Sequence, residues 1–445
     1  MIRQVLLLLL VVATLGAQMS ERRSRSGYPT VSNLVGVFHA YPMESNDSSM
    51  CVIGYRLEAS DLLFMRSSNG SSGFVAEYTV TVELQDTLGV VRFARVFRDS
   101  IRRVQPAGAF EAVPAWNTAI VVLAHGRYTM SVDVVQQQRQ RMFWKAPIVL
   151  SADAQSIANA SLTFVSSQAS ADTAICAQPW GGVIPFGTLE SEALLVLPRS
   201  WTGRDKLQIE CQLVGQEYPL FRGTDTVVNI PVTIRQQPLL SLPQPLMSGQ
   251  TQRAFCVDLA QSVRYRTLRF RLDVRRAVPG TYRLLVVRPS TQDTIRGTFM
   301  LRWFSPPPYL LASRSAVDVM YYVLSDDEYR QLLEMPDSIR TAAVIEWWKQ
   351  HDPTPATLYN EAMVEYFRRA YVARTKFATA YEPDGALTER GKVFILFGEP
   401  TRIESDLDPD RGGTETWYYT NSVRKRFSFV ITEQGHFRLV AVESL

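Results

Sequence analysis

Short runs of alternating apolar and polar residues, separated by turn-forming clusters, dominate residues 76–304. Residues 76–84 read AEYTVTVEL, so Tyr78, Val80 and Val82 lie on one face of an extended chain. A period of two residues indicates a half-buried strand, and many short strands bounded by Gly, Pro, Asp and Ser are typical of β-sandwiches. This pattern restricts that part of the chain to an all-β architecture.

The pattern Gly-x-Tyr-x-apolar-x-Val occurs twice, in residues 126–132 and again in residues 280–286. Glycine permits a tight entry into a strand, and the alternate residues that follow point into a core. A chain of 445 residues is expected to hold about two to four domains. We therefore predict a multidomain chain with two tandem all-β sandwich (Ig-like) domains followed by a C-terminal α+β domain. The predicted boundaries are 28–150 and 155–304 for the β-sandwiches, 305–314 for a Pro-rich linker and 315–445 for the α+β domain.

Helical signals begin only after the Ser-Pro-Pro-Pro sequence at 305–308. Ser325 and Glu328 have the spacing of a capping box, which predicts the start of a helix. Thr354 followed by Pro355 predicts the N-cap and first turn of a later, long amphipathic helix. We expect helices at about 325–335, 338–350 and 354–377, and a terminal hairpin of 427–432 with 437–442.

Residues 381–400 read YEPDGALTERGKVFILFGEP, an apolar run between two turn-forming clusters. Asp384-Gly385 is a turn signal. We interpret Val393 to Phe397 as a buried strand that ends at the turn of residues 398–400. The glycines in this segment are too few, and wrongly placed, for a phosphate-binding loop that opens a helix.

The first residues, MIRQVLLLLLVVATLGAQ, combine one arginine, an apolar stretch and small residues. This layout is that of a secretory signal peptide, which we place at 1–17, with a polar leader at 18–27. No later stretch reaches the roughly eighteen apolar residues of a membrane-spanning helix. We expect an exported protein in the periplasm or at the outer cell surface. The net charge of +4 gives no support for nucleic-acid binding, which requires a concentrated basic face.

Four cysteines, Cys51, Cys176, Cys211 and Cys256, allow three pairwise connectivities in an oxidising compartment. None belongs to a Cys-x-x-Cys pair, so zinc or thioredoxin-like chemistry has no support. Each cysteine is equally well explained as a small buried apolar residue. If one bridge forms, we expect Cys176–Cys211, because both residues fall in one predicted domain.

Several blocks near the C-terminus agree in order and spacing with a known domain. They are WKQHDPTPATLYNE at 348–361, EYFRR at 365–369, GALTERG at 385–391, GEP at 398–400 and ETWYY at 415–419. Together they resemble the GWxTD domain of exported bacterial proteins, over the stretch from about Ala316 to Leu445. Where that family has Gly-Trp-x-Thr-Asp, this chain has Gly385-Ala386-Leu387-Thr388-Glu389, so the Trp is missing and the Asp is lengthened. The resemblance implies export, often with β-rich regions upstream, and implies no reaction.

The blocks define a set of candidate binding or motif residues. It comprises His351, Asp352, Thr354, Asn360, Glu361, Arg368, Arg369, Gly385, Thr388, Glu389, Arg390, Gly391, Gly398, Glu399, Pro400 and Trp417. Glu361 and Glu365 could perform acid–base chemistry or, with His351, bind a metal. Their spacing fits an i,i+4 ion-pair ladder with Arg368 and Arg369 better, because nothing completes a metal shell.

Arg390 has the same two interpretations. It could bind a carboxylate or phosphate in bidentate fashion. Alternatively, it pairs with Glu361 or Glu399 inside the fold, while Thr388 bonds to the backbone of an ordinary turn. We favour the structural interpretation.

Aromatic residues at 347–348 and 417–419 could line a glycan platform, but more often such side chains form a core. The four histidines are scattered, and no HExxH motif or catalytic triad is legible. We therefore hypothesise an exported envelope protein without catalytic activity, without cofactor or metal, that binds other envelope proteins. The alternative is a glycan-binding protein or hydrolase whose site combines His351, Asp352, Glu361, Arg390 and Glu399.

Overall fold

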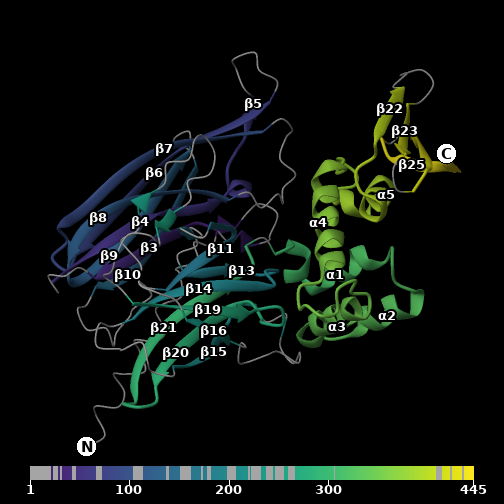
Figure 1. The fold of residues 1–445 in the computed structure, drawn as a ribbon. Helices are drawn as coiled ribbons and strands as arrows, with labels where there is room; N and C mark the ends of the chain where they lie inside the picture. Colours follow the sequence, from purple (N-terminus) through teal and green to yellow (C-terminus); the bar gives the residue numbers. More distant parts are fainter. Residues whose placement is uncertain are drawn as a thin grey trace, which may run out of the picture. The chain divides into compact units, whose positions relative to one another are not determined.

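The computed structural model describes most of the chain (Figure 1). The described residues are 22–23, 29–30, 33–42, 47–66, 73–103, 114–136, 140–150, 162–171, 174–177, 182–197, 207–218, 221, 232–236, 244–245, 255–258, 266–304, 306–406, 413–420, 423–432 and 435–445. The predicted signal peptide, 1–17, lies outside them, as does the predicted leader except for residues 22–23. The chain divides into two compact units, Met1–Tyr218 with Thr226–Ser305 (unit 1) and Pro219–Asp225 with Pro306–Leu445 (unit 2).

The first half of unit 1 contains two antiparallel sheets. One has the order β3-β4-β8; the other has the order β10-β9-β6-β5, with β7 also paired to β6. The bounds are β3 (Val35–Pro42), β4 (Ser48–Glu58), β5 (Met65–Arg66), β6 (Phe74–Asp86), β7 (Val91–Arg103), β8 (Pro114–Ala124), β9 (Gly126–Gln136) and β10 (Gln140–Leu150), preceded by the short pair β1 (Arg22–Arg23) and β2 (Pro29–Thr30). The alternation predicted in residues 76–84 is confirmed, because Tyr78, Val80, Val82 and Leu84 of β6 are all buried.

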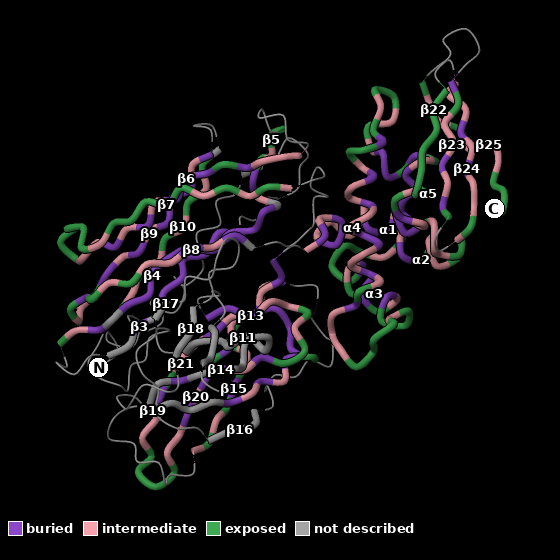
Figure 2. The backbone as a smooth tube through the Cα atoms, turned by 45° about the horizontal axis from the view of Figure 1, so that its top comes forward, coloured by how far each residue is buried: buried purple, intermediate pink, exposed green. Residues whose placement is uncertain are grey.

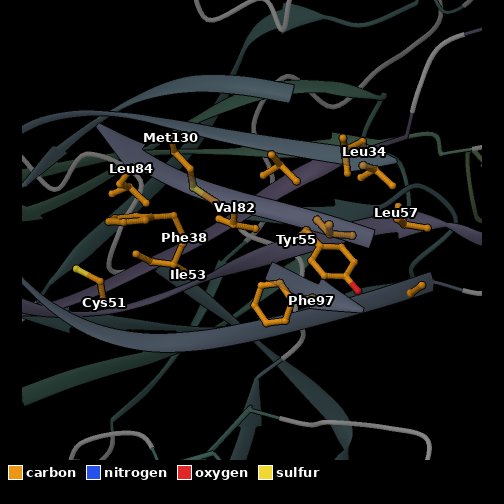
Figure 3. Close-up of a cluster of buried hydrophobic side chains, with 14 of the residues drawn as sticks. Leu34, Phe38, Cys51, Ile53, Tyr55, Leu57, Val82, Leu84, Phe97 and Met130 are labelled. Carbon is orange, nitrogen blue, oxygen red and sulfur yellow. The ribbon is translucent and has the colours of Figure 1, made fainter. Parts of the chain in front are cut away.

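These two sheets share one hydrophobic core (Figure 3). Ile53 and Tyr55 of β4 meet Val82 of β6 and Met130 of β9 in a single buried cluster. Residues two apart on each strand point to the same side. The apolar side chains of both sheets therefore gather between them.

The second half of unit 1 is also built from β-strands, which form two further sheets. Their strand orders are β16-β19-β14-β11-β12-β18-β17 and β13-β21-β20-β15. The bounds are β11 (Leu162–Ala171), β12 (Ala174–Ala177), β13 (Val183–Pro185), β14 (Glu190–Leu197), β15 (Gln208–Gln216), β16 (Val232–Gln236), β17 (Gln244–Pro245), β18 (Phe255–Asp258), β19 (Arg266–Asp273), β20 (Gly280–Arg288) and β21 (Asp293–Arg302). Phe270 of β19 and Tyr282 of β20 belong to one buried cluster, so these sheets also share a core.

The two Gly-x-Tyr repeats make the same hydrogen bond. The hydroxyl of Tyr128 donates to the carbonyl oxygen of Ala124 at 2.7 Å, and that of Tyr282 donates to Val278 at 2.8 Å. Each tyrosine ring is buried, and its hydroxyl reaches back four residues to the turn before the strand. A buried hydroxyl needs such a partner, so the repeat fixes the entry to β9 and to β20 in the same way.

A buried ion pair lies where the two halves of unit 1 meet. Arg56 and Glu58 on β4 pair with each other, although both are almost completely buried. The Arg56 guanidinium lies 3.7 Å from the ring centre of Phe304, which packs with Val35 and Val183. Burial raises the pKa of Glu58, although the positive charge of Arg56 opposes this shift. The two β-rich halves of this unit are therefore joined by a packed interface.

Unit 2 contains helices and one antiparallel sheet of order β22-β23-β24-β25 (Figure 1). The helices are η4 (Pro308–Leu311), α1 (Ser313–Met320), α2 (Asp326–Glu334), α3 (Asp337–Gln350), α4 (Glu361–Lys376), η5 (Gly385–Leu387) and α5 (Glu389–Phe397); the strands are β22 (Arg402–Asp406), β23 (Thr414–Tyr419), β24 (Lys425–Ile431) and β25 (Phe437–Ser444). Within the segment predicted as the linker 305–314, η4 and the start of α1 are formed. None of the described helices is both long and apolar enough to cross a membrane.

Local helix and hairpin signals in unit 2 are confirmed. Ser325 and Glu328 form the predicted capping box at the start of α2, which ends before Met335. The helix expected at 338–350 is α3, and the terminal hairpin is β24 with β25. The capping box and the hairpin each depend on residues that are close together in the sequence, so both can be predicted without knowledge of tertiary contacts.

Three predictions are wrong. The expected strand Val393 to Phe397 is the second half of α5, whose residues 393–395 are buried (Figure 2). The N-cap of α4 is Asn360 and not Thr354, so the helix begins only at Glu361. The expected Cys176–Cys211 bridge is absent, because Cys211 is a free, buried thiol.

Candidate functional site

Thr388 organises the motif loop between α4 and α5. Its hydroxyl accepts the backbone N–H of Gly391 at 2.9 Å and donates to the carbonyl oxygen of Gly385 at 2.8 Å. The first contact is the N-cap of α5; the second ties that cap to the preceding turn of η5. Thr388 is buried. Its hydroxyl therefore satisfies two buried backbone groups that no water reaches.

Two glycines allow the backbone segments of this loop to touch. A Cβ on Gly391 would lie 2.1 Å from the carbonyl oxygen of Gly385 and 2.8 Å from that of Ala386. A Cβ on Gly385 would lie 2.4 Å from the carbonyl oxygen of Ala373, near the end of α4. All of these neighbours are backbone atoms and cannot rotate away. Glycine is needed at both positions because α4, η5 and α5 approach one another without space for a side chain.

Ala386 stands at the position where the family has Trp, and the surrounding residues bury it. Ala386 is fully buried, and its carbonyl oxygen accepts a hydrogen bond from the Tyr322 hydroxyl at 2.9 Å. The side chain of Asp384 accepts the backbone N–H of Ala386 at 3.0 Å. Asp384 thus caps η5 as an Asx turn does.

Arg390 lies in an aromatic and acidic environment. Its guanidinium carbon is 3.3 Å from the ring centre of Phe437, and its Nη1 is 3.4 Å from Oε1 of Glu415. The same carboxylate oxygen accepts the indole N–H of Trp417 at 2.7 Å. Burial lowers the pKa of Arg390 and the charge of Glu415 opposes that shift. The predicted partners of Arg390 were Glu361 and Glu399, and both are wrong.

Trp417 belongs to the core rather than to a surface platform. It is almost completely buried, with its ring centre 5.3 Å from that of Phe377 and 5.1 Å from that of Phe429. Tyr419 is also buried and donates to the carbonyl oxygen of Gly398 at 2.9 Å.

The ends of α5 are held by charged side chains. Glu389, the first residue of the helix, accepts the backbone N–H of Leu439 on β25. At the other end, Nη1 of Arg369 lies 3.4 Å from the carbonyl oxygens of Ile395 and Leu396. Gly398 ends the helix with a φ of 80°, in the left-handed region that favours glycine. An acidic residue at the N-terminus and a cation at the C-terminus both complement the helix dipole.

The opposite end of α4 holds a second group of the predicted residues. Asn360 is buried, accepts the N–H of Met363 at 2.8 Å and donates to the carbonyl oxygen of Trp348 at 2.7 Å. It caps α4 and joins it to the end of α3. Asp352 accepts the N–H of Thr354 at 2.8 Å, and the Thr354 hydroxyl donates to the carboxylate of Glu361.

His351, Trp347 and Glu328 complete this end; the first is exposed and the other two are partly buried. The ring of His351 stacks on Trp347 with centres 4.0 Å apart, and its Nδ1 lies 2.8 Å from the Trp347 carbonyl oxygen. The indole N–H of Trp347 donates to Glu328 at 2.9 Å. Hydrogen bonds from Ser325, together with this indole contact, hold the pKa of Glu328 at about 2.

Comparison with known proteins agrees with the blocks seen in the sequence. Residues 284–442 match the GWxTD domain. The match begins inside β20, upstream of the start expected near Ala316.

Other comparisons add little. No curated protein matches the chain. One similar solved structure is Bacteroides ovatus mixed-linkage glucan utilization locus SGBP-B in complex with a mixed-linkage heptasaccharide. Its identity is 9%, and the similarity covers 54% of this chain and 45% of that one. The TM-score is 0.11, so this likeness carries no weight for fold or function.

The GWxTD-domain residues do not converge on one centre. They form two groups at opposite ends of α4. Residues 351–361 lie beside the start of the helix, and residues 385–391, together with Trp417, lie beside its end. Glu365, between them, pairs with Arg368 at 2.6 Å and with Arg369 at 2.7 Å. Although burial raises the pKa of Glu365, the hydrogen bonds from the two arginines outweigh it and the pKa is lowered.

The remaining predicted residues, Glu399 and Pro400, follow the end of α5. Glu399 pairs with Lys376 at 3.1 Å, and Pro400 follows at the turn into β22. Within the described residues, no group of three or more His, Cys, Asp or Glu could hold a metal ion. The carboxylates described above therefore have neighbouring side chains or backbone groups as partners, at separate places: Asp352, Glu361, Glu365, Glu389 and Glu399.

Sequence reasoning missed the contributions of β23 and β25. Glu415 and Phe437 hold Arg390, and the backbone of Leu439 binds Glu389. The pairs are 25 to 50 residues apart, so no local periodicity brings them together. The sequence did contain one set of helix signals. Thr388 is an N-cap residue, Glu389 is an acidic residue in the first turn, and Gly398 follows the apolar run as a C-terminal signal.

Proposed function

We propose that this chain is an exported protein of the bacterial envelope, in the periplasm or at the outer cell surface, that binds other envelope proteins without catalysing a reaction. Two Ig-like β-sandwiches, at 28–150 and 155–304, act as spacer and docking modules. The GWxTD domain at the C-terminus recognises a protein partner. The signal-peptide layout of residues 1–17 supports export.

Two observations support the β-sandwich interpretation. In each half of unit 1, two sheets share a single buried cluster. Each half also has a buried tyrosine whose hydroxyl bonds to a carbonyl oxygen four residues upstream. Such a tyrosine corner is a recurrent feature of Ig-like sandwiches.

One observation carries the non-catalytic interpretation: the naming motif of the GWxTD domain is used to build the fold. The hydroxyl of Thr388 has both of its hydrogen bonds inside the loop, and Gly385 and Gly391 admit no side chain. Glu389 binds a backbone N–H of β25. A general acid or base must be within reach of a substrate proton, and these groups already have backbone partners.

The partner is tested by recovering it with the whole protein. The full chain with its own leader would be expressed at native level, cross-linked in intact cells and purified from the envelope fraction. We expect one or a few envelope proteins to be recovered in fixed proportion. A matched bait, Glu361→Gln, should recover the same proteins, because this exposed carboxylate contacts Thr354 and lies away from the motif loop. Recovery of unbound monomer only would count heavily against the proposal.

The alternative, a glycan-binding protein or hydrolase with a carboxylate and arginine site, predicts a different outcome. In that case Glu361→Gln would abolish binding or turnover of an envelope glycan while the melting temperature stays unchanged. Binding of purified envelope glycans by the wild-type chain, lost in this variant, would replace our proposal with the alternative.

A further inference from the structure

Two of the four cysteines are directly opposed in the backbone register of two short strands. β12 (Ala174–Ala177) and β18 (Phe255–Asp258) pair in antiparallel fashion, and Cys176 is the register partner of Cys256. The strands lie about 80 residues apart in the sequence, a separation at which only the tertiary fold brings two cysteines together.

Backbone register alone meets the distance requirement of a disulfide. Directly opposed residues of an antiparallel pair have Cα atoms about 4.5 or 5.5 Å apart, depending on the hydrogen-bonding position. A disulfide accepts Cα separations of about 4.4 to 6.8 Å. The pairing continues on both sides, with Ile175 opposite Val257 and Ala177 opposite Phe255. Closing a bridge between these two residues therefore requires no change of register.

The other two cysteines do not compete for this pairing. Cys51 on β4 and Cys211 on β15 are free thiols and almost completely buried. Burial raises the pKa of each thiol to about 12. Both therefore remain protonated at neutral pH, and a protonated thiol neither attacks a disulfide nor is easily oxidised.

We propose that Cys176 and Cys256 form a disulfide bond in the exported protein. The inference rests on the export proposed above, because disulfides persist in oxidising compartments. The oxidant is a protein disulfide of the thiol–disulfide oxidoreductase class. One cysteine thiolate attacks a sulfur of that disulfide and forms a mixed disulfide; the second thiolate then displaces the oxidant. The S–S bond of the oxidant breaks, the Cys176–Cys256 bond forms, and two electrons and two protons leave with the reduced dithiol.

The proposed bond would stabilise the pairing of these two strands. At this end of the seven-stranded sheet the order is β12-β18-β17, and these strands have only four, four and two residues. Such short strands contribute few ladder hydrogen bonds, so their register is weakly specified. A covalent link between β12 and β18 fixes that register and closes a loop of about 80 residues in the unfolded chain, which favours the folded state.

The test counts thiols by alkylation and peptide mapping of the full chain, in two arms. In one arm the protein is exported with its own leader and recovered from the periplasm of a bacterial host; in the other, purified reduced protein is equilibrated in a glutathione redox buffer. In denaturant without reductant we expect only Cys51 and Cys211 to be labelled, and the peptides of Cys176 and Cys256 to be linked. After reduction all four should be labelled. The variant Cys256→Ser should leave Cys176 free, so that three thiols are labelled.

The two arms separate failure of the disulfide from failure of export. Four free thiols in the glutathione arm, or a linked peptide that contains Cys211, overturns the disulfide. A bridge in glutathione with an unprocessed, reduced chain in cells leaves the disulfide standing and overturns export. Reduction should also lower the thermal midpoint of the wild type by about 5–10 °C and leave that of the double variant Cys176→Ser, Cys256→Ser unchanged.

Discussion

Replacing Thr388 by valine tests whether the motif is a structural junction. Valine keeps the branched shape of threonine but has no hydroxyl. It removes the N-cap of α5 at the Gly391 N–H and the bond to the carbonyl oxygen of Gly385. Both residues are buried. The Gly391 N–H would lose this partner, and the Gly385 carbonyl oxygen would keep only the backbone N–H of residue 388, at 3.4 Å. If Thr388 were a nucleophile or proton donor instead, the variant would keep its stability and lose only an activity.

The cost follows from two terms. Loss of an N-cap costs about 1 kcal/mol, with a range of roughly 0.5–2. Loss of the second buried hydrogen bond, whose acceptor keeps the backbone N–H of residue 388 at 3.4 Å, adds about 0.5–1.5 kcal/mol. We therefore expect Thr388→Val to destabilise unit 2 by about 1–3.5 kcal/mol, which for a unit of this size lowers its melting temperature by roughly 3–10 °C.

The assay is thermal and denaturant unfolding of the full chain, with hydrogen exchange to locate the change. Amides of α5 should exchange faster in Thr388→Val than in the wild type, while β6 and β9 are unaffected. Thr388→Ser keeps the hydroxyl and should stay within about 1 kcal/mol of the wild type. Thr375→Val is a matched control, because Thr375 is exposed and its hydroxyl contacts only the carbonyl oxygen of Val372. A Thr388→Val chain within about 0.5 kcal/mol of the wild type would refute the junction.

Three further predictions concern the same unit. Gly391→Ala should lower the free energy of unfolding in urea by about 3 kcal/mol or prevent folding, because its Cβ would overlap backbone oxygens. Gly215→Ala is the control and should be nearly neutral in the same assay, because its Cβ would lie in open space. Asn360→Ala should cost about 2 kcal/mol in the same assay through its lost cap and buried amide contact, whereas Glu361→Gln should cost less than about 1 kcal/mol. The depressed pKa of Glu328, about 2, means that its stabilising contribution is complete above its unfolded pKa of 4.5 and is lost as the pH falls towards about 2. In Glu328→Gln, melting temperatures measured between pH 5 and about 2 should fall less steeply than in the wild type.

Signals that act over a few residues could be predicted from the sequence. The capping box of Ser325 and Glu328, the alternation in β6 and the hairpin of β24 with β25 all follow from neighbouring residues. Their energies are local, since each depends on a hydrogen bond or a face within one or two turns of chain. The two Gly-x-Tyr repeats belong to the same class, because each tyrosine bonds only four residues upstream.

The conformation of residues 389–397 needed the tertiary structure. An unbroken apolar run of five residues fits a buried strand or a buried helix equally well, because periodicity cannot distinguish them. The helix forms because Thr388 caps its N-terminus, because Gly391 lets it approach η5 closely, and because the surrounding chain buries residues 393–395. Burial on more than one side removes the amphipathic pattern that would have identified a helix.

The sequence by itself determined that β-strands dominate residues 76–304 and that helices begin after them, the capping box at Ser325, and the resemblance to the GWxTD domain. Only the tertiary structure decided which distant residues meet. Arg390 binds Glu415 and Phe437 rather than Glu361 or Glu399, and the backbone register pairs Cys176 with Cys256 rather than with Cys211. The physical reason is that strand register and helix packing set these contacts, and many registers satisfy the same local propensities. A single register buries the apolar faces of all elements together, and that condition is a property of the whole fold.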